Sequence, residues 1–296
     1  MSALRRFAAD RWAVAAAVFL LALHLVALGA PWIVTHLLHS SAFHLAIQEH
    51  VVAGGRLVEV ISPEGVPVGP IPRFPLGADL IGRDVLARMI YGARISLLVT
   101  TVGTLLAVGL GLLVGLIAGF YRGLVDAVLS RIVDAMMAIP ILLLAIALAS
   151  VLREGSVWTV VLILGLVNWT YLARIIRAEV LSLREQEFVE AARALGASRF
   201  RLVVRHILPN ALGPVIVAAT IDVAAAIITE STLSFLGLGF PPDIPSWGRI
   251  LFDAKDNLDV APHWALFAGG AIFLAVLAIS FMGDGLRDAL DPRRVM

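Results

Sequence analysis

The sequence predicts an all-α integral membrane protein with six transmembrane helices. Hydrophobic residues make up 60% of the 296-residue chain and charged residues only 15%, and the mean hydropathy is +0.94. Soluble domains carry about 25% charged residues, so this composition excludes an ordinary water-soluble enzyme. The net charge of +1 gives no indication of nucleic-acid binding, and the absence of cysteine excludes disulfides and thiolate-bound metal.

Six intervals with few or no charges are long enough to cross a membrane, because about 20 apolar residues span a hydrocarbon core of about 30 Å. These intervals are 12–34, 95–121, 135–152, 155–173, 211–233 and 264–283. Pro140 is expected to kink the third. The first interval could also be a signal peptide, but its length and the position of Pro31 favour an uncleaved helix.

The distribution of basic residues predicts the orientation. Fifteen of the 23 lie in the amino terminus, the turn near residue 121, the segment 174–206 and the carboxyl tail. They are Arg5, Arg6, Arg11, Arg122, Arg131, Arg174, Arg177, Arg184, Arg193, Arg199, Arg201, Arg205, Arg287, Arg293 and Arg294. The positive-inside rule places these segments in the cytoplasm, so both termini are expected there.

The cytoplasmic loop 184–209 is predicted to form two short amphipathic helices. Its apolar residues recur at helical spacing; they are Phe188, Ala191, Ala192 and Leu195, then Phe200, Val203, Val204, Ile207 and Leu208. Gly196 separates the two helices, Ser198 can cap the second, and Pro209 is expected to end it. The pattern leaves two functions open: contact with a groove on a partner protein, or a position on the anionic membrane surface.

The same loop resembles a known motif. Glu190-Ala191-Ala192-x3-Gly196, followed by Leu208-Pro209, is similar to the EAA motif of permease subunits of bacterial ABC importers. His206 stands where the general motif has isoleucine, as in the peptide/nickel branch of that family. The resemblance implies that these residues dock into a cleft of an ATPase subunit and transmit its motion.

Three further stretches resemble the same branch. They are 75–97, with Ala78 where threonine is usual, 233–248, and 283–293. Together they cover the chain from about residue 75 to its end, whereas residues 36–74 match no motif. The resemblance is to the second, C-type permease of dipeptide and oligopeptide importers, and it implies a type I ABC importer permease fold.

The resemblance also implies an organisation and a set of partners. The expected segments are 1–93 (cytoplasmic tail, first span and outer segment), 94–284 (the five-helix permease domain) and 285–296 (cytoplasmic tail). The expected partners are a second homologous permease, two ATPase subunits, an external substrate-binding protein, membrane lipid and a peptide-like substrate, in a bacterial inner membrane. The outer loop 237–262 is the candidate contact with the binding protein.

The chain is not expected to be an enzyme or to hold a cofactor. A phosphate-binding P-loop needs Gly-x4-Gly-Lys-Ser/Thr, and the one lysine, Lys255, lies outside any such motif. ATP and Mg²⁺ are therefore assigned to the partner subunits. Nickel chelates and opine-like solutes are alternative cargoes. An ion-coupled secondary transporter or a membrane-embedded enzyme is less favoured, because neither explains the cytoplasmic loop.

Two carboxylates interrupt the fifth span. Asp222 lies about 16 Å along the helix from residue 211, near the membrane midplane. A charge there costs roughly 2.5–3.5 kcal/mol on insertion scales, so Asp222 either lines a translocation path or is packed and hydrogen-bonded between helices. Glu230 opens a family-like run and is favoured as a gate or pathway residue.

Two other clusters have alternative interpretations. His36, His39, His44 and His50 could bind Ni²⁺ or Zn²⁺, but a polar interfacial segment without metal is favoured, so no metal site is predicted. Gly111, Gly115 and Gly119 recur every four residues in the second span. Such spacing allows close helix contact, and packing within the subunit is favoured over packing against the partner permease.

Overall fold

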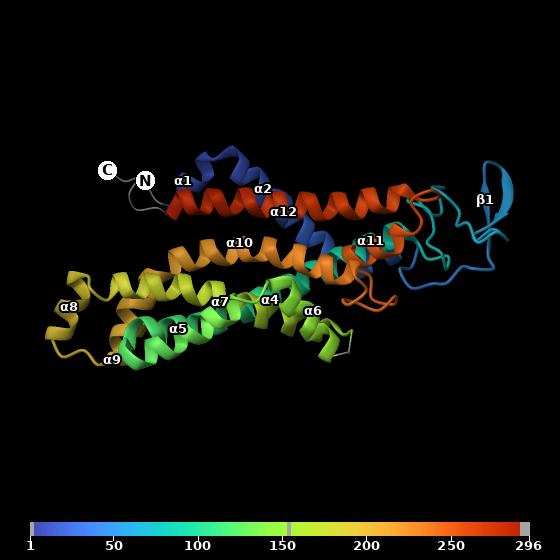
Figure 1. Cartoon of the computed structure of the whole chain (residues 1–296). Helices are drawn as coiled ribbons and strands as arrows, with labels where there is room; N and C mark the ends of the chain where they lie inside the picture. The colour runs from blue at the N-terminus through green and yellow to red at the C-terminus, as the bar shows by residue number, and fades with distance from the viewer. Residues whose placement is uncertain (1–2, 153–154, 291–296) are drawn as a thin grey trace.

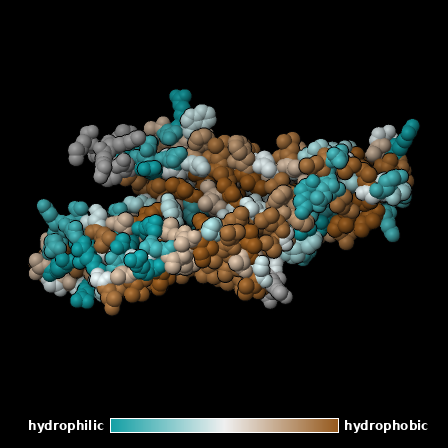
Figure 2. Space-filling model, viewed as in Figure 1, coloured by the Kyte–Doolittle hydropathy of each residue, from teal (hydrophilic) through white to brown (hydrophobic). Residues whose placement is uncertain are grey.

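The computed structural model describes residues 3–152 and 155–290. Within them, five helices are long and apolar enough to cross a membrane, and a bent helix pair makes up to six. The five are α2 (Arg11–Leu28), α4 (Val85–Tyr121), α7 (Val157–Leu183), the continuous helix Arg199–Phe235 and α12 (Pro262–Leu290). They run roughly along one axis, with an apolar middle and hydrophilic surface toward both ends (Figures 1 and 2). The predicted all-α membrane class is confirmed.

The third predicted span is not one kinked helix. Helix α5 (Gly123–Met137) and helix α6 (Ile141–Leu152) are bent by 86° relative to each other. The break lies just before Pro140, since a residue preceding proline disfavours the helical conformation. At about 1.5 Å per residue, α6 alone extends about 18 Å, which is too short to cross the hydrocarbon core.

Helices α4 and α7 pack together along a seam of glycines. An added Cβ at three of them would lie 2.8 Å from a Cβ atom of α7. These glycines are Gly111, Gly115 and Gly119, and the facing residues are Leu172, Ile176 and Val180. The favoured prediction, packing within the subunit, is confirmed. Because no side chain intervenes, the two backbones approach closely over several turns.

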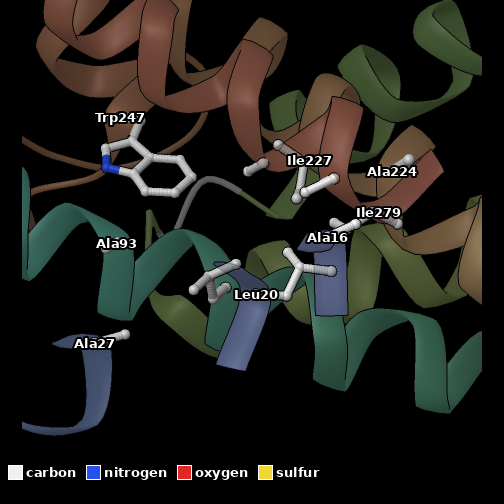
Figure 3. Packing of buried hydrophobic residues seen from close by; sticks show 11 residues of the cluster. Ala16, Leu20, Ala27, Ala93, Ala224, Ile227, Trp247 and Ile279 are labelled. Atoms are coloured by element: carbon white, nitrogen blue, oxygen red, sulfur yellow. The ribbon is translucent and has the colours of Figure 1, made fainter. Parts of the chain in front are cut away.

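The first span joins the helical core. Side chains from α2, α4, α10 (Leu208–Phe235), α11 (Trp247–Lys255) and α12 meet in one buried cluster (Figure 3). It includes Ala16, Leu20, Ala27, Ala93, Ala224, Ile227, Trp247 and Ile279. The short helix α1 (Ala3–Ala9) contacts α12, and both lie at the same end of the molecule as α8 (Glu187–Ala194) (Figure 1).

The segment between the first two spans forms a small layer at the opposite end (Figure 1). Helix α3 (Ala30–Trp32) and the π-turn η1 (Ile33–Leu37) extend α2, and β1 (His50–Ala53) pairs antiparallel with β2 (Arg56–Glu59). The connecting residues Gly54 and Gly55 have φ values of +57° and +79°, which suit a two-residue hairpin turn. No structure was predicted here from the sequence.

The glycine seam predicts a position-specific stability effect. Gly115→Ala adds a methyl group against the α7 backbone and Ile176, and we expect a loss of about 1–3 kcal/mol from overpacking. The matched control is Gly109→Ala on the same helix, because nothing lies within 4 Å of a Cβ there. Thermal unfolding of the purified subunit measures both variants, and an equal loss at the two positions would contradict the seam.

Candidate functional site

The predicted cytoplasmic loop forms a helical hairpin at one end of the molecule (Figure 1). It consists of α8, a turn and α9 (Arg199–Arg201). On α8, Val189 is fully buried, and Ala192 packs partly buried beside it. They contact a cluster that includes Leu202 and Ile207, together with residues of α4, α7 and α10. The inner face of the hairpin is therefore fixed to the helical core.

The turn between the two helices depends on Gly196. This residue has φ +83°, a conformation that L side chains rarely adopt. Its N–H donates to the Arg193 carbonyl at 3.0 Å, and the Ala197 N–H donates to the Ala192 carbonyl at 3.1 Å. This pair of bonds is a Schellman motif, which satisfies the last carbonyls of α8. Ser198 Oγ then accepts from the Arg201 N–H at 3.3 Å and caps α9.

Pro209 does not end the second helix, contrary to the expectation. The helix runs on from Arg199 to Phe235, with the π-turn η2 (Leu202–Ile207) between α9 and α10. There the Leu208 N–H donates to the carbonyl of Val203, five residues earlier. The wider turn shifts the bonding register just before proline, which lacks an N–H. The hairpin thus continues directly into α10.

The outer face of the hairpin is apolar and uncovered. Phe188 is 42% exposed, Leu195 89% and Phe200 77%, and Ala191 is exposed between them. At the edge of this face, Arg193 Nη1 donates to Glu190 Oε1 at 2.6 Å. His206 is half-buried, with its carbonyl bonded to Asn210 Nδ2 at 2.6 Å. Exposed aromatic and leucine side chains beside small alanines suit docking of another protein surface.

Two arginines that the sequence analysis did not single out hold the base of the hairpin. Arg184 Nη1 donates to the carbonyls of Phe120, at 2.6 Å, and Gly119, at 3.4 Å. These bonds satisfy two of the last carbonyls of α4. Arg184 is also the residue at which α7 ends and the hairpin begins. Arg122 pairs with Glu185 at the same junction.

Asp222 is buried between α10 and α4. Its side chain accepts a hydrogen bond from Thr104 Oγ1 at 3.0 Å, and the residue is 5% exposed. Asp222 is thus packed and hydrogen-bonded between helices, and its role in a translocation path stays a prediction. A polar contact of this kind links two helices where the surroundings are apolar.

Glu230 is completely enclosed. Its carboxylate accepts from Ser96 Oγ of α4 at 3.1 Å and from Ser234 Oγ at 2.9 Å. Ser96 Oγ in turn accepts from the Trp247 N–H of α11 at 3.3 Å. Gly248 lies so close to α10 that an added Cβ would be 2.6 Å from Ser231 Cα. The gate or pathway role of Glu230 stays a prediction, and its contacts join three helices.

Two of the four histidines singled out in the sequence, His44 and His50, pair with different glutamates. His44 Nε2 lies 2.5 Å from Glu49 Oε1, and Glu49 also accepts from Arg73 Nη2 at 2.7 Å. The hydrogen bond with His44 and the charge of Arg73 lower the pKa of Glu49. His50 faces Glu59 at 3.8 Å. Among the described residues, no three His, Asp or Glu side chains are grouped as metal ligands.

Comparison with known proteins gives the class of this molecule. The family model of the binding-protein-dependent transport system inner membrane component matches residues 111–296. A putative peptide permease of Brucella ovis is 48% identical over 219 residues, 73% of this chain and 72% of the relative. The glutathione transport system permease protein GsiD of Escherichia coli is 37% identical over 289 residues, 98% of this chain and 89% of the relative.

A further relative and a solved structure agree. The dipeptide transport permease DppC of Alkalihalophilus pseudofirmus is 40% identical over 225 residues, 76% of this chain and 74% of the relative. The MetNI methionine ABC transporter, in an inward-facing form, matches with a TM-score of 0.58 and 22% identity, over 70% of this chain and 97% of the other.

The fold is therefore that of a type I importer permease, a transport subunit of the inner membrane. The chain belongs to the family of binding-protein-dependent inner membrane components, in the peptide/nickel branch of ABC importer permeases.

The hydrogen bonds of Glu230 allow a test that separates a pathway role of this residue from a structural role. Glu230→Ala leaves the hydroxyls of Ser96 and Ser234 without their acceptor, and each unsatisfied buried group costs about 1–3 kcal/mol. Glu230→Gln keeps one carbonyl oxygen, so we expect a smaller loss. Thermal unfolding and transport are measured on the same preparations. If both variants unfold like the wild type and fail to transport, the pathway role is correct and the structural one is wrong.

Proposed function

We propose that this chain forms half of the translocation pore of an ATP-driven importer for peptides. The relatives named as peptide, dipeptide and glutathione permeases support this cargo class. A second homologous permease completes the pore, two ATPase subunits hydrolyse ATP with Mg²⁺, and an external binding protein delivers the peptide. The observation that carries the proposal is the hairpin, whose inner face is buried and whose outer face is apolar and exposed.

The end that carries α8 faces the cytoplasm in this proposal. The concentration of arginines in the segments near this end supports that orientation. Both termini then lie in the cytoplasm, and the β1–β2 hairpin lies outside. The segments are 1–93, 94–284 and 285–296, with the coupling helices at 184–209. Helix α4 begins at Val85, so the first boundary falls within its opening turns.

Docking of the hairpin is proposed to use the small residues on its outer face. Ala191 lies between Phe188 and Leu195 along the helix, so an ATPase surface can approach the α8 backbone there. Gly196 fixes the angle between α8 and α9. The π-turn η2 and Pro209 connect the hairpin to α10, so a movement of the hairpin would reach α10. Glu190, Ala192, His206 and Leu208 belong to the same coupling segment in this proposal.

A groove between α7, α10 and α12 is proposed as this chain's part of the translocation path. It is a cavity of about 710 Å³, visible as a hollow toward the α8 end in Figure 2. Its lining is mainly apolar, with Tyr171 and Ile221 along its length and Glu179 and Arg287 as its charged residues. Asp222 points from the same helix toward α4 instead.

The docking proposal predicts a contrast between two alanines of α8. Ala191→Arg places a long charged side chain on the outer face, and we expect at least a tenfold loss of ATPase subunits co-purified with the permease. Ala194→Arg is the matched control, because Ala194 is also exposed but lies off the Phe188–Leu195 stripe. Quantitative mass spectrometry of the purified complex measures both. Equal retention of ATPase in both variants argues against this docking face.

The pathway proposal predicts selective chemical labelling, for which the cysteine-free sequence is suited. Ile221→Cys lies in the groove, whereas Ile216→Cys on the same helix has similar exposure and lies outside it. In inside-out vesicles, we expect a membrane-impermeant thiosulfonate to modify position 221 about tenfold faster and to block transport of labelled dipeptide. Labelling of position 216 alone would contradict the path. Transport of Ni²⁺ and not of dipeptide would identify nickel as the cargo.

A further inference from the structure

A cluster of charged residues lies at the end of the molecule opposite α8. It joins the segment before α4 to the loop after α10 and to α11. The cluster consists of Asp79, Arg83, Arg88, Arg249 and Asp253, whose side chains are only 2–19% exposed. Arg83 Nη1 and Arg88 Nη2 both donate to the Pro242 carbonyl, at 2.7 and 3.1 Å. The cluster therefore fixes the outer loop to the start of α4.

The cluster contains three guanidinium groups and only two carboxylates. Asp79 is already bonded to Arg83 Nε at 2.6 Å and to the backbone N–H groups of Ile81 and Arg83. Asp253 lies 2.9 Å from Arg249 but 3.9 Å from Arg88. One positive charge is thus not matched within the cluster, and an unmatched buried charge is costly.

Two buried donors show where acceptors are lacking. Arg88 Nη1 and Arg249 Nε have no hydrogen-bond partner among the described residues. The side chain of Arg88 is only 2% exposed. Buried polar groups are nearly always bonded in folded proteins, so such exceptions indicate a missing partner. The partner that fits both the donors and the charge is an anion.

A cavity of about 170 Å³ lies against this cluster. Arg83 and Arg249 line it together with Asp79, Asp253, Pro242 and Ile81. Arg88 does not line the cavity but contacts both of these aspartates, at 3.6 and 3.9 Å. Its size suits a single carboxylate, for which arginine offers paired donors. The excess of positive charge disfavours a metal cation at the same place.

We infer that this pocket binds a carboxylate that arrives from the outer side of the membrane. The inference rests on the proposed function, which places this end of the molecule outside. The carboxylate has two possible sources: an acidic side chain of the docked binding protein, or the α-carboxylate of a peptide released from it. In both, the carboxylate supplies the negative charge that the cluster of three arginines and two aspartates lacks.

Substitutions of the two partners in the Arg249–Asp253 ion pair are expected to change carboxylate binding in opposite directions. Arg249→Gln removes the excess charge, and we expect about tenfold weaker binding of the carboxylate. Asp253→Asn doubles the excess, and we expect binding several-fold tighter. Loss of a merely structural ion pair would weaken binding in both variants. Lys255→Gln is the matched control, since it removes a positive charge from exposed α11 surface outside the cluster.

The experiment uses the complete complex in lipid nanodiscs, with its binding protein added in solution. Affinity of the labelled binding protein measures the first source. Competition and transport of N-acetyl-dialanine, compared with its carboxamide, measure the second. If Arg249→Gln and Asp253→Asn shift the affinity for the binding protein in opposite directions, the ligand is an acidic side chain of that protein. If they shift the preference for the free acid over the carboxamide in opposite directions, the ligand is the peptide carboxylate.

Two results overturn the inference. One is a loss of binding in both charge variants, which identifies the cluster as a structural clamp alone. The other is unchanged docking and unchanged acid preference in variants that assemble normally. Failure of the proposed function gives a different result, because the wild-type complex would then show no ATP hydrolysis stimulated by the binding protein.

Discussion

Close contact between α4 and α7 determines where both ends of the molecule lie. The glycine seam lets the two backbones touch over several turns, with added Cβ atoms excluded at 2.8 Å. At one end of the seam, Arg184 bonds the last carbonyls of α4 and so holds the start of the hairpin. At the other end, α4 carries Arg88 into the charged cluster. Loosening this seam would therefore move the proposed docking face and the proposed carboxylate pocket together.

The polar groups buried beside this seam restrict how α10 can move. Asp222 and Glu230 are eight residues apart on α10, about two turns, and both accept hydrogen bonds from α4 through Thr104 and Ser96. Apolar packing between membrane helices is weakly directional, whereas each of these bonds requires one register. Since the helix Arg199–Phe235 is continuous from the hairpin through α10, a push on the hairpin would act on α10, and α10 would have to keep or exchange these bonds.

Sequence signals were sufficient where the cause of the structure is local. Gly196 and Ser198 end and begin helices through their own backbone and side-chain bonds. The π-turn before Pro209 was not predicted, and at Pro140 a kink was predicted where the structure has an 86° break. Proline can start a helix or break one depending on the bonds around it. Gly54-Gly55 carried a usable turn signal that was overlooked. The partners of Asp222 and Glu230 come from a helix over 100 residues away in sequence, which no local pattern specifies.

The contacts of α4 also connect the two ends chemically. Arg88 and Ser96 are eight residues apart, so they lie on similar faces of α4. Arg88 shares Asp253 with Arg249 of α11, and Ser96 accepts from the Trp247 N–H at the start of α11 while donating to Glu230 of α10. A carboxylate that drew Arg249 toward itself would shift α11 against α4, because Asp253 of α11 also contacts Arg88 of α4. Because α11 and α10 touch at Gly248 with no room for a Cβ, α10 would have to follow. Helix α10 is continuous with the hairpin that is proposed to dock.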